Sequence, residues 1–276
     1  SGHRQVRGTR PANGEKMSTT NAQGLVSAGV IVTHNSERFL PALLASIADQ
    51  TRPLDQLIVI DDRSTDATTS ILSEHGIMPT RASSAATDLS TRIAENFAQG
   101  VRKTPAGAVV ILGDHDDVWR PGRVAHQMHA FEQAPLLAML ASDGEVNEQE
   151  TLRTTFPIPA DWSDMSKAKQ FTYALRHSIA TGGASAIRPV NLTDIEVPRG
   201  WLHDRWWSLA ATAQGRMALD TEIVIDYRIT PEQQVGLDSA NQNAGRLAWL
   251  SGHARNAGVS AARGSEIMKL VIRARR

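Results

Sequence analysis

Three short apolar runs, each ending in polar side chains, constrain the fold of this chain most strongly. They are Leu25–Thr33, Gln56–Ile60 and Ala108–Leu112. Runs this short and this rich in Val and Ile are typical of strands buried on both faces of a parallel sheet. Apolar residues at helical spacing lie between the runs, so strands alternate with helices. We therefore predict an α/β fold with a mostly parallel sheet flanked by helices.

The other predicted elements follow from the same periodicities. Helices are expected over 39–47, 66–75, 90–103, 122–133, 167–177 and 202–214. Asn35 or Ser36 is expected to cap the first of these helices. The second half is less regular, with strands predicted over 136–142, 178–187 and 221–227. The tail, 241–276, predicts two C-terminal helices that are broken near Gly258.

Polar clusters follow all three apolar runs directly. They are Thr33-His34-Asn35, Asp61-Asp62 and the segment from Asp114 to Asp117. Because crossovers between parallel strands are right-handed, the three strands end at one edge of the sheet. Ligands of open α/β sheets bind beyond that edge. The sequence therefore predicts a ligand site built from these clusters.

The segment Asp114-His115-Asp116-Asp117 is the strongest candidate for a metal site. Three carboxylates within four residues repel one another unless a cation or a hydrogen-bond donor holds them. Oxygen ligands of this kind suit Mg²⁺ or Mn²⁺, which bridge diphosphates. The alternative is a polar turn or a helix cap without a metal, and the pattern leaves it open.

Two further clusters lie in the second half. Asp204 stands beside His203 among the tryptophans at 201, 206 and 207. A carboxylate in such an aromatic setting is a candidate general base, although the tryptophans are equally consistent with a core-facing helix. The pair Gly182-Gly183 is either a simple bulge or a place where the backbone approaches a ligand closely.

Composition excludes several classes of protein. Lys and Arg number 29, as do Asp and Glu, so the basic excess typical of a nucleic-acid-binding protein is missing and no nucleic-acid partner is expected. The absence of cysteine excludes disulfides and thiol nucleophiles. No apolar run approaches the roughly 18 residues that span a bilayer. We expect a cytoplasmic protein. Residues 1–23 are expected to be a disordered arm, either native or left over from cloning.

Seven segments in order resemble the motifs of family 2 glycosyltransferases with the GT-A fold, most closely their bacterial rhamnosyltransferase-like branch. The resemblance covers about 26–236, and the segments are VIVTHNSERFL, LIVIDDRSTDAT, ENFAQGV, GDHDDVWRPGRV, TGGASA, WLHDRWWSLAATAQG and DYRITPEQQVG. It implies a glycosyltransferase domain over 24–236, with a nucleotide half (24–117) and an acceptor half (118–236). Residues 237–276 would form a helical extension.

The resemblance also implies a role for each matching residue. Asp204 would be the catalytic base, and Asp114 and Asp116 would hold Mg²⁺ or Mn²⁺. The acceptor pocket would include His203, Trp206 and Trp119. The nucleotide sugar would be bound by Thr33, Asn35, Glu37, Asp61, Asp62, Asn96, Asp114, His115, Gly183 and Arg228. Ile229 and Thr230 follow Tyr227-Arg228 where the family carries its His, so Arg228 is expected to carry more of the diphosphate contact.

The implied reaction is inverting, metal-dependent transfer of a sugar from a TDP- or UDP-sugar to a glycan or lipid-linked acceptor, as in the synthesis of cell-surface polysaccharide. One alternative is a nucleotidyltransferase that makes sugar nucleotides, and another is an inactive module that binds nucleotide sugars. The basic C-terminal helix could contact the inner face of the membrane or end in solvent, and both readings remain open.

Overall fold

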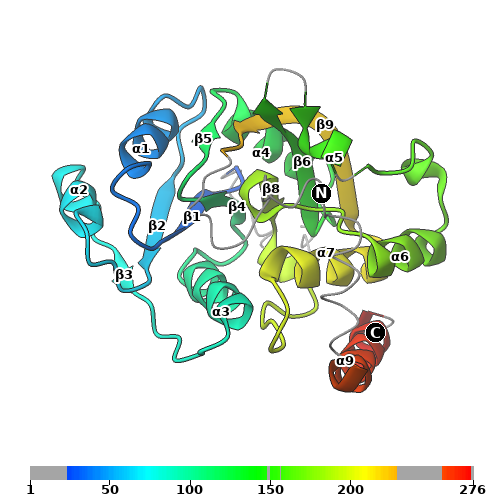
Figure 1. Cartoon of the computed structure of the whole chain (residues 1–276). Coiled ribbons are helices and arrows are strands. Elements are labelled where there is room, and N and C mark those ends of the chain that lie inside the picture. The colour runs from blue at the N-terminus through cyan, green and yellow to red at the C-terminus, as the bar shows by residue number, and fades with distance from the viewer. Residues whose placement is uncertain (1–23, 148–149, 156, 229–256, 275–276) are drawn as a thin grey trace, which may run out of the picture.

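The computed structural model describes residues 24–147, 150–155, 157–228 and 257–274, and Figure 1 shows their arrangement. A single nine-stranded sheet runs through the molecule in the order β3-β2-β1-β4-β8-β6-β9-β5, and β7 pairs with β6 outside this path. Helices cover both faces of the sheet (Figure 1). This is the α/β architecture that the alternation of apolar strands and helices predicts.

The bounds of the elements agree closely with the sequence periodicities in the first half. The strands are β1 (Ser27–Thr33), β2 (Gln56–Asp61), β3 (Thr80–Arg81), β4 (Val109–Asp114), β5 (Val118–Trp119), β6 (Met139–Asn147), β7 (Glu150–Thr151), β8 (Ser185–Ile187) and β9 (Met217–Asp226). The helices are α1 (Leu40–Ala48), α2 (Thr68–Glu74), α3 (Leu89–Arg102), α4 (Arg123–Gln133), α5 (Leu152–Thr155), α6 (Lys167–Arg176), α7 (His203–Gln214) and α9 (Ala257–Ala274). Short 3₁₀ turns are η1 (Trp162–Asp164), η2 (Gly182–Ala184) and η3 (Pro189–Asn191).

The first four strands of the sheet are parallel, and their carboxyl ends meet at one edge. Thr33 at the end of β1 pairs with Asp61 of β2, and Val32 pairs with Asp114 of β4. The three polar clusters that follow these strands therefore lie next to one another. This register confirms the predicted edge.

Beyond β4 the sheet is mixed. β8 runs antiparallel to both β4 and β6, while β9 runs parallel to β6 and antiparallel to β5. The strand expected over 178–187 is reduced to β8, because Gly182 and Gly183 form the turn η2 instead. The antiparallel direction of β8 brings this turn to the same edge as the carboxyl end of β4.

Alternate residues of the central strands pack into two apolar cores, one on each face of the sheet. Val30 packs with Phe97 of α3 and Trp207 of α7. Ile31 points the other way and packs with residues of α1 and α4, such as Leu43 and Phe131. This alternation explains why the strands read as continuous apolar runs.

The start of α1 differs from its expected form. Neither Asn35 nor Ser36 caps the helix with its side chain, because α1 begins at Leu40 with Phe39 in the cap position. The backbone carbonyl of Ser36 instead accepts from the amides of Phe39 and Leu40. The three residues before the helix thus form a turn that lengthens the loop after β1.

The C-terminal helix α9 packs against α7 below the sheet in Figure 1, with Leu270 buried in the contact. The second of the two predicted tail helices is thereby confirmed, while the first falls outside the described residues. Within the part of the chain that the structure describes, no helix combines the length and apolarity needed to cross a membrane.

Candidate active site

A cavity of about 150 Å³ opens where β1, β2 and β4 end. Helices α3 and α7, the turn η2 and the residue after β9 complete its wall. Its lining residues are Val32, Thr33, His34, Asp62, Ile93, Phe97, Asp114, His115, Asp116, Thr181, Gly182, Leu202, His203, Asp204 and Tyr227. The cavity therefore joins the N-terminal polar clusters to the acidic residue of α7, although these are far apart in sequence.

The segment from Asp114, the last residue of β4, to Asp117 is called the acidic turn below. It contributes Asp114 and Asp116 to the cavity wall. Burial, together with the charges of Asp116 and Asp204, raises the pKa of Asp114 to about 7. Burial also raises the pKa of Asp117 well above its usual range, and the charges of Asp114 and Asp116 add to the effect. The turn thus crowds carboxyl groups in a place where water does not screen them, and this disfavours their ionised forms unless a cation binds.

Arg123 is the cation buried nearest this turn. It is 1% exposed, its guanidinium lies 4.1 Å from the centre of the Trp119 ring, and its Nη2 donates to the carbonyl of Leu112 at 2.6 Å. The charges of Asp117 and Asp114 offset part of the burial penalty, which lowers the pKa of Arg123 to about 9. Arg123 therefore supplies an internal countercharge to the acidic turn.

The turn η2 lies directly against the carboxylates of Asp114 and Asp117 and against the ring of His203. A Cβ added to Gly183 would come within 2.5 Å of Asp117 Oδ2 and 2.8 Å of Asp114 Oδ2. A Cβ added to Gly182 would lie 2.6 Å from Nε2 of His203. Glycine is thus required here by protein side chains. The expectation that Gly183 contacts the nucleotide sugar stays a prediction, and Gly183 is not among the residues that line the cavity.

Asp204 stands in the first turn of α7, where the helix dipole favours a negative charge. Its Oδ2 accepts from the Gly182 amide at 3.1 Å, and its Oδ1 accepts from the Arg205 amide at 2.6 Å. These two bonds fix the plane of the carboxylate. Asp204 is therefore oriented at the cavity wall and faces the acidic turn, whose Asp114 feels its charge.

His203 lies beside Asp204 but is almost fully buried. Its ring stacks on Phe97 with centroids 3.8 Å apart and meets Trp207 edge-on at 5.2 Å. Neither ring nitrogen has a hydrogen-bond partner among the described residues. Burial lowers the pKa of His203 to about 4. The ring is therefore neutral near pH 7, and its two nitrogens are buried within the protein.

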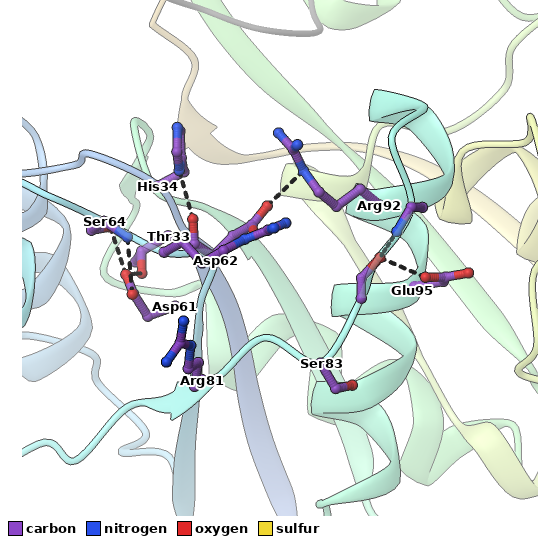
Figure 2. A network of polar contacts seen from close by, with 12 residues as sticks. Thr33, His34, Asp61, Asp62, Ser64, Arg81, Ser83, Arg92 and Glu95 are labelled. Carbon is purple, nitrogen blue, oxygen red and sulfur yellow. Dashed lines mark hydrogen bonds and ion pairs between the residues drawn. The ribbon is translucent and has the colours of Figure 1, made fainter.

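Asp62 also lines the cavity, and Figure 2 shows its network of polar contacts. Its carboxylate pairs with Nε of Arg92 at 2.8 Å and with Nε of Arg63 at 3.0 Å. Nδ1 of His34 donates to the backbone carbonyl of Asp62 at 2.7 Å. Arg92 of α3 thus contacts the acidic residue that lines the cavity.

Asp61, next to Asp62, points away from the cavity. Its Oδ1 accepts from the hydroxyls of Thr33 and Ser64, at 3.0 and 2.6 Å, as Figure 2 shows. The backbone amide of Ser64 adds a third bond at 3.1 Å. Asp61 therefore shapes the loop after β2, and only Thr33 and Asp62 of this group line the cavity.

Asn35 and Glu37 were expected to hold a nucleoside, but their side chains are occupied by the protein. Asn35 Oδ1 accepts from the Thr65 amide at 2.8 Å, and Glu37 Oε2 accepts from the Ala67 amide at 2.9 Å. Both bonds tie the loop after β1 to the loop after β2. Neither residue lines the cavity, so we place them as supports of its rim.

Two tryptophans expected in an acceptor pocket are core residues. Trp119 is 2% exposed and packs over Gly29 and Gly113 on the α1 and α4 face of the sheet. Trp206 is 4% exposed and packs against Trp201. Since neither lines the cavity, the structure does not bring them to the site.

Asn96 and Arg228 also lie outside the cavity lining. Asn96 is fully buried in α3, and its amide has no hydrogen-bond partner among the described residues. Arg228 is bound through its backbone, whose amide donates to Asp117 Oδ1 at 3.3 Å. Its guanidinium lies 5.8 Å from the centre of the Phe39 ring.

The acidic turn provides some of the oxygen ligands that a divalent cation needs, but not a complete set. Asp114 and Asp116 offer hard oxygen ligands toward the cavity, and their mutual repulsion favours a cation between them. However, nowhere in the described residues do three or more His, Asp or Glu side chains converge in a ligating arrangement. Protein ligands would therefore be few, as is usual for Mg²⁺ bound partly by a substrate's phosphates.

Several cavity residues were missed from the sequence. Ile93, Phe97, Thr181 and Tyr227 form its apolar and hydroxyl-bearing wall. Phe97 belongs to the apolar stripe of α3, which the periodicity assigned to the core. Nothing in a stripe of this kind distinguishes a residue at the edge of the core from one at its centre.

Comparisons with known proteins agree with this arrangement. The model of the family described as Glycosyl transferase family 2 matches residues 30–192, which is more than half of the chain. The match spans the three polar strand ends and the turn η2. No curated protein sequence matches the chain.

Solved structures of low sequence identity share the fold. A crystal structure of residues 1–349 of S. aureus TarS with UDP-GlcNAc has a TM-score of 0.55 at 13% identity, covering 77% of this chain and 62% of that TarS chain. Glucosyl-3-phosphoglycerate synthase from Mycobacterium tuberculosis with UDP has a TM-score of 0.55 at 17% identity, covering 82% and 80%. The same enzyme with Mn²⁺ and UDP-glucose gives 0.52 at 18%, covering 76% and 73%. The chain thus spans less than two thirds of the TarS structure.

Proposed function

Because the chain belongs to glycosyl transferase family 2, we propose that it transfers a sugar from a nucleoside diphosphate sugar to a hydroxyl group of an acceptor. One observation carries the proposal. Asp114, Asp116 and the oriented carboxylate of Asp204 line the same cavity. This arrangement supports a diphosphate site and a proton acceptor within one space.

The donor would bind at the edge formed by β1, β2 and β4. Thr33, His34 and Asp62 offer hydrogen-bonding groups to the nucleoside, with Asp62 held in place by Arg92. The TarS and synthase structures contain UDP or UDP-sugars, which supports a UDP- or TDP-sugar as the donor here.

Asp114 and Asp116 are the residues that would hold Mg²⁺ or Mn²⁺. Bound there, the cation would neutralise the negative charge that develops on the diphosphate leaving group. The synthase structure solved with Mn²⁺ and UDP-glucose supports this choice of ion. His115 follows Asp114 at the cavity wall, and burial lowers its pKa, so a neutral ring would face a diphosphate bound there.

Asp204 is the proposed base of an inverting transfer. The acceptor oxygen attacks the anomeric carbon from the face opposite the diphosphate and gives its proton to Asp204, while the bond to the diphosphate oxygen breaks. The two amide hydrogen bonds hold the carboxylate in one orientation and leave its remaining lone pairs for the hydroxyl. His203 and Leu202 shape the adjoining wall, where we place the acceptor.

The acceptor we favour is a hydroxyl of a glycan or of a lipid-linked glycan used for surface polysaccharide. Membrane contact through α9 has less support. Arg263 donates to the Gly200 carbonyl, Arg273 pairs with Asp194, and Lys269 pairs with Glu266 of the same helix. The described basic side chains of α9 therefore have partners in the protein, which favours a docked helix over a membrane anchor.

A product assay tests the function directly. The purified chain is incubated with Mn²⁺ and with UDP-GlcNAc, UDP-glucose or TDP-rhamnose, and the released phosphates are separated by chromatography. Release of UDP or TDP supports the transferase, whereas release of pyrophosphate would identify a nucleotidyltransferase. Binding of the nucleotide sugars in a thermal-shift assay, without any turnover, would instead indicate an inactive module.

A further inference from the structure

The three carboxylates of the acidic turn do not point the same way. Asp114 and Asp116 line the cavity, but Asp117 is fully buried and does not. We propose that Asp117 is a positioning residue, which fixes the chain just beyond β9 and so holds Tyr227 against the cavity. In this role Asp117 binds neither the cation nor the donor.

The contact between Asp117 and Arg228 continues the pairing of two strands. In the β5–β9 ladder Val118 lies opposite Asp226, and Trp119 lies opposite Ile225. The backbones separate beyond this point. There, Oδ1 of Asp117 accepts a hydrogen bond from the Arg228 amide at 3.3 Å. A side chain thus replaces the next bond of the ladder and fixes the direction of the chain as it leaves the sheet.

The remaining surroundings of Asp117 are protein as well. Its Oδ2 packs against Gly183 so closely that a Cβ there would lie 2.5 Å away. On the inner side, the buried guanidinium of Arg123 lies within electrostatic reach. Asp117 Oδ2 and Arg123 Nη1 both lack a hydrogen-bond partner among the described residues. The carboxylate is therefore held between a glycine and an internal countercharge, away from the cavity.

The consequence for ligand binding comes through Tyr227. This residue lines the cavity, its amide donates to the Glu145 carbonyl at 2.7 Å, and it directly precedes Arg228. The Glu145 bond fixes one side of Tyr227, and Asp117 fixes the other. The effect on donor affinity rests on the proposed function, but the effect on the backbone does not.

Two substitutions separate positioning from metal binding. Asp117→Asn retains an oxygen that accepts the Arg228 amide, whereas Asp117→Ala removes it. Amide hydrogen exchange of the peptide containing Tyr227 and Arg228 is measured together with calorimetric affinities for Mn²⁺ and for UDP. Asp116→Asn serves as the comparison for a ligand. Asp143→Asn is the matched control, because Asp143 is 4% exposed and also accepts from backbone amides, those of Gly144 and Arg153.

We expect Asp117→Ala to speed exchange at Arg228 at least tenfold and to weaken UDP binding, while Asp117→Asn restores both. Mn²⁺ affinity should change less than threefold in Asp117→Asn and far more in Asp116→Asn. Equal loss of Mn²⁺ affinity in the two Asn variants would overturn the proposal. Unchanged exchange in Asp117→Ala would overturn it too. A wild-type chain that bound neither Mn²⁺ nor UDP would instead count against the proposed function, and exchange would still decide the role of Asp117.

Discussion

The backbone amide of Gly182 donates a hydrogen bond to Oδ2 of Asp204 at 3.1 Å. The next residue, Gly183, packs against the carboxylates of Asp114 and Asp117. One short turn therefore contacts both the candidate base and the acidic turn. Its conformation therefore affects how far Asp204 lies from Asp114 and Asp117.

Asp204→Asn should lower turnover by about 10²–10⁴, the usual contribution of a general base. Asn retains the oxygen that accepts the Gly182 amide but cannot take up the acceptor proton. Donor affinity should therefore change little. Steady-state kinetics with a true acceptor, together with calorimetry on the nucleotide sugar, measure the two effects. Wild-type turnover in this variant would show that another group is the base.

Gly183→Ala should lower the free energy of unfolding by about 1–3 kcal/mol, the usual cost of overpacking a buried site. The new methyl group would displace the carboxylates of Asp114 and Asp117, so affinity for Mn²⁺ should fall as well. Gly122→Ala is the control, because a Cβ at Gly122 has no atom within 4 Å. Denaturant unfolding compares the two variants, and equal stabilities would refute the packing argument.

The raised pKa of Asp114 predicts a pH-dependent stability. The unfolded carboxyl loses its proton near pH 4, whereas the folded one keeps it until about pH 7. Between these values the folded state binds more protons, so the contribution of Asp114 to stability falls as pH rises. Without metal, Asp114→Asn should therefore gain stability relative to the wild type from pH 5 to pH 8. Thermal unfolding across this range measures the difference, and a constant difference would contradict the prediction.

His203 predicts the opposite trend at lower pH. Its folded pKa of about 4 lies below the unfolded value near 6.5, so the unfolded state binds more protons between them. Wild-type stability should fall as pH drops from 6.5 to 4. His203→Phe keeps an aromatic ring beside Phe97 and should show a smaller fall. His129→Gln, at an exposed position, is the control for the same melting series and should follow the wild type.

The edge of the sheet could be predicted because it depends on local signals. Strands β1, β2 and β4 are short, apolar and followed by polar residues, and these features alone place Thr33, Asp62 and Asp114 together. The role predicted for Asp204, that of a catalytic base, rests on the resemblance to a family of enzymes. Spacing along the chain could not bring α7 to β4, since that contact depends on the antiparallel course of β8.

Some candidate residues lie outside the cavity because their side chains could turn either way. Trp119 stands two residues after Asp117, yet its ring packs on the α1 and α4 face of the sheet, where Arg123 stacks on it. Asn35 and Glu37 carry polar groups suited to a ligand, but these groups already accept hydrogen bonds from the backbone amides of Thr65 and Ala67. A motif shows which residue types occur together, whereas tertiary packing decides which of them reach a cavity.

The docking of α9 also affects the start of α7. Arg263 donates to the Gly200 carbonyl, and its guanidinium lies 5.1 Å from the centre of the Trp201 ring, two residues before His203. A chain that ended at residue 256 would lack both contacts of Arg263, and the segment that leads into Asp204 would lose this support.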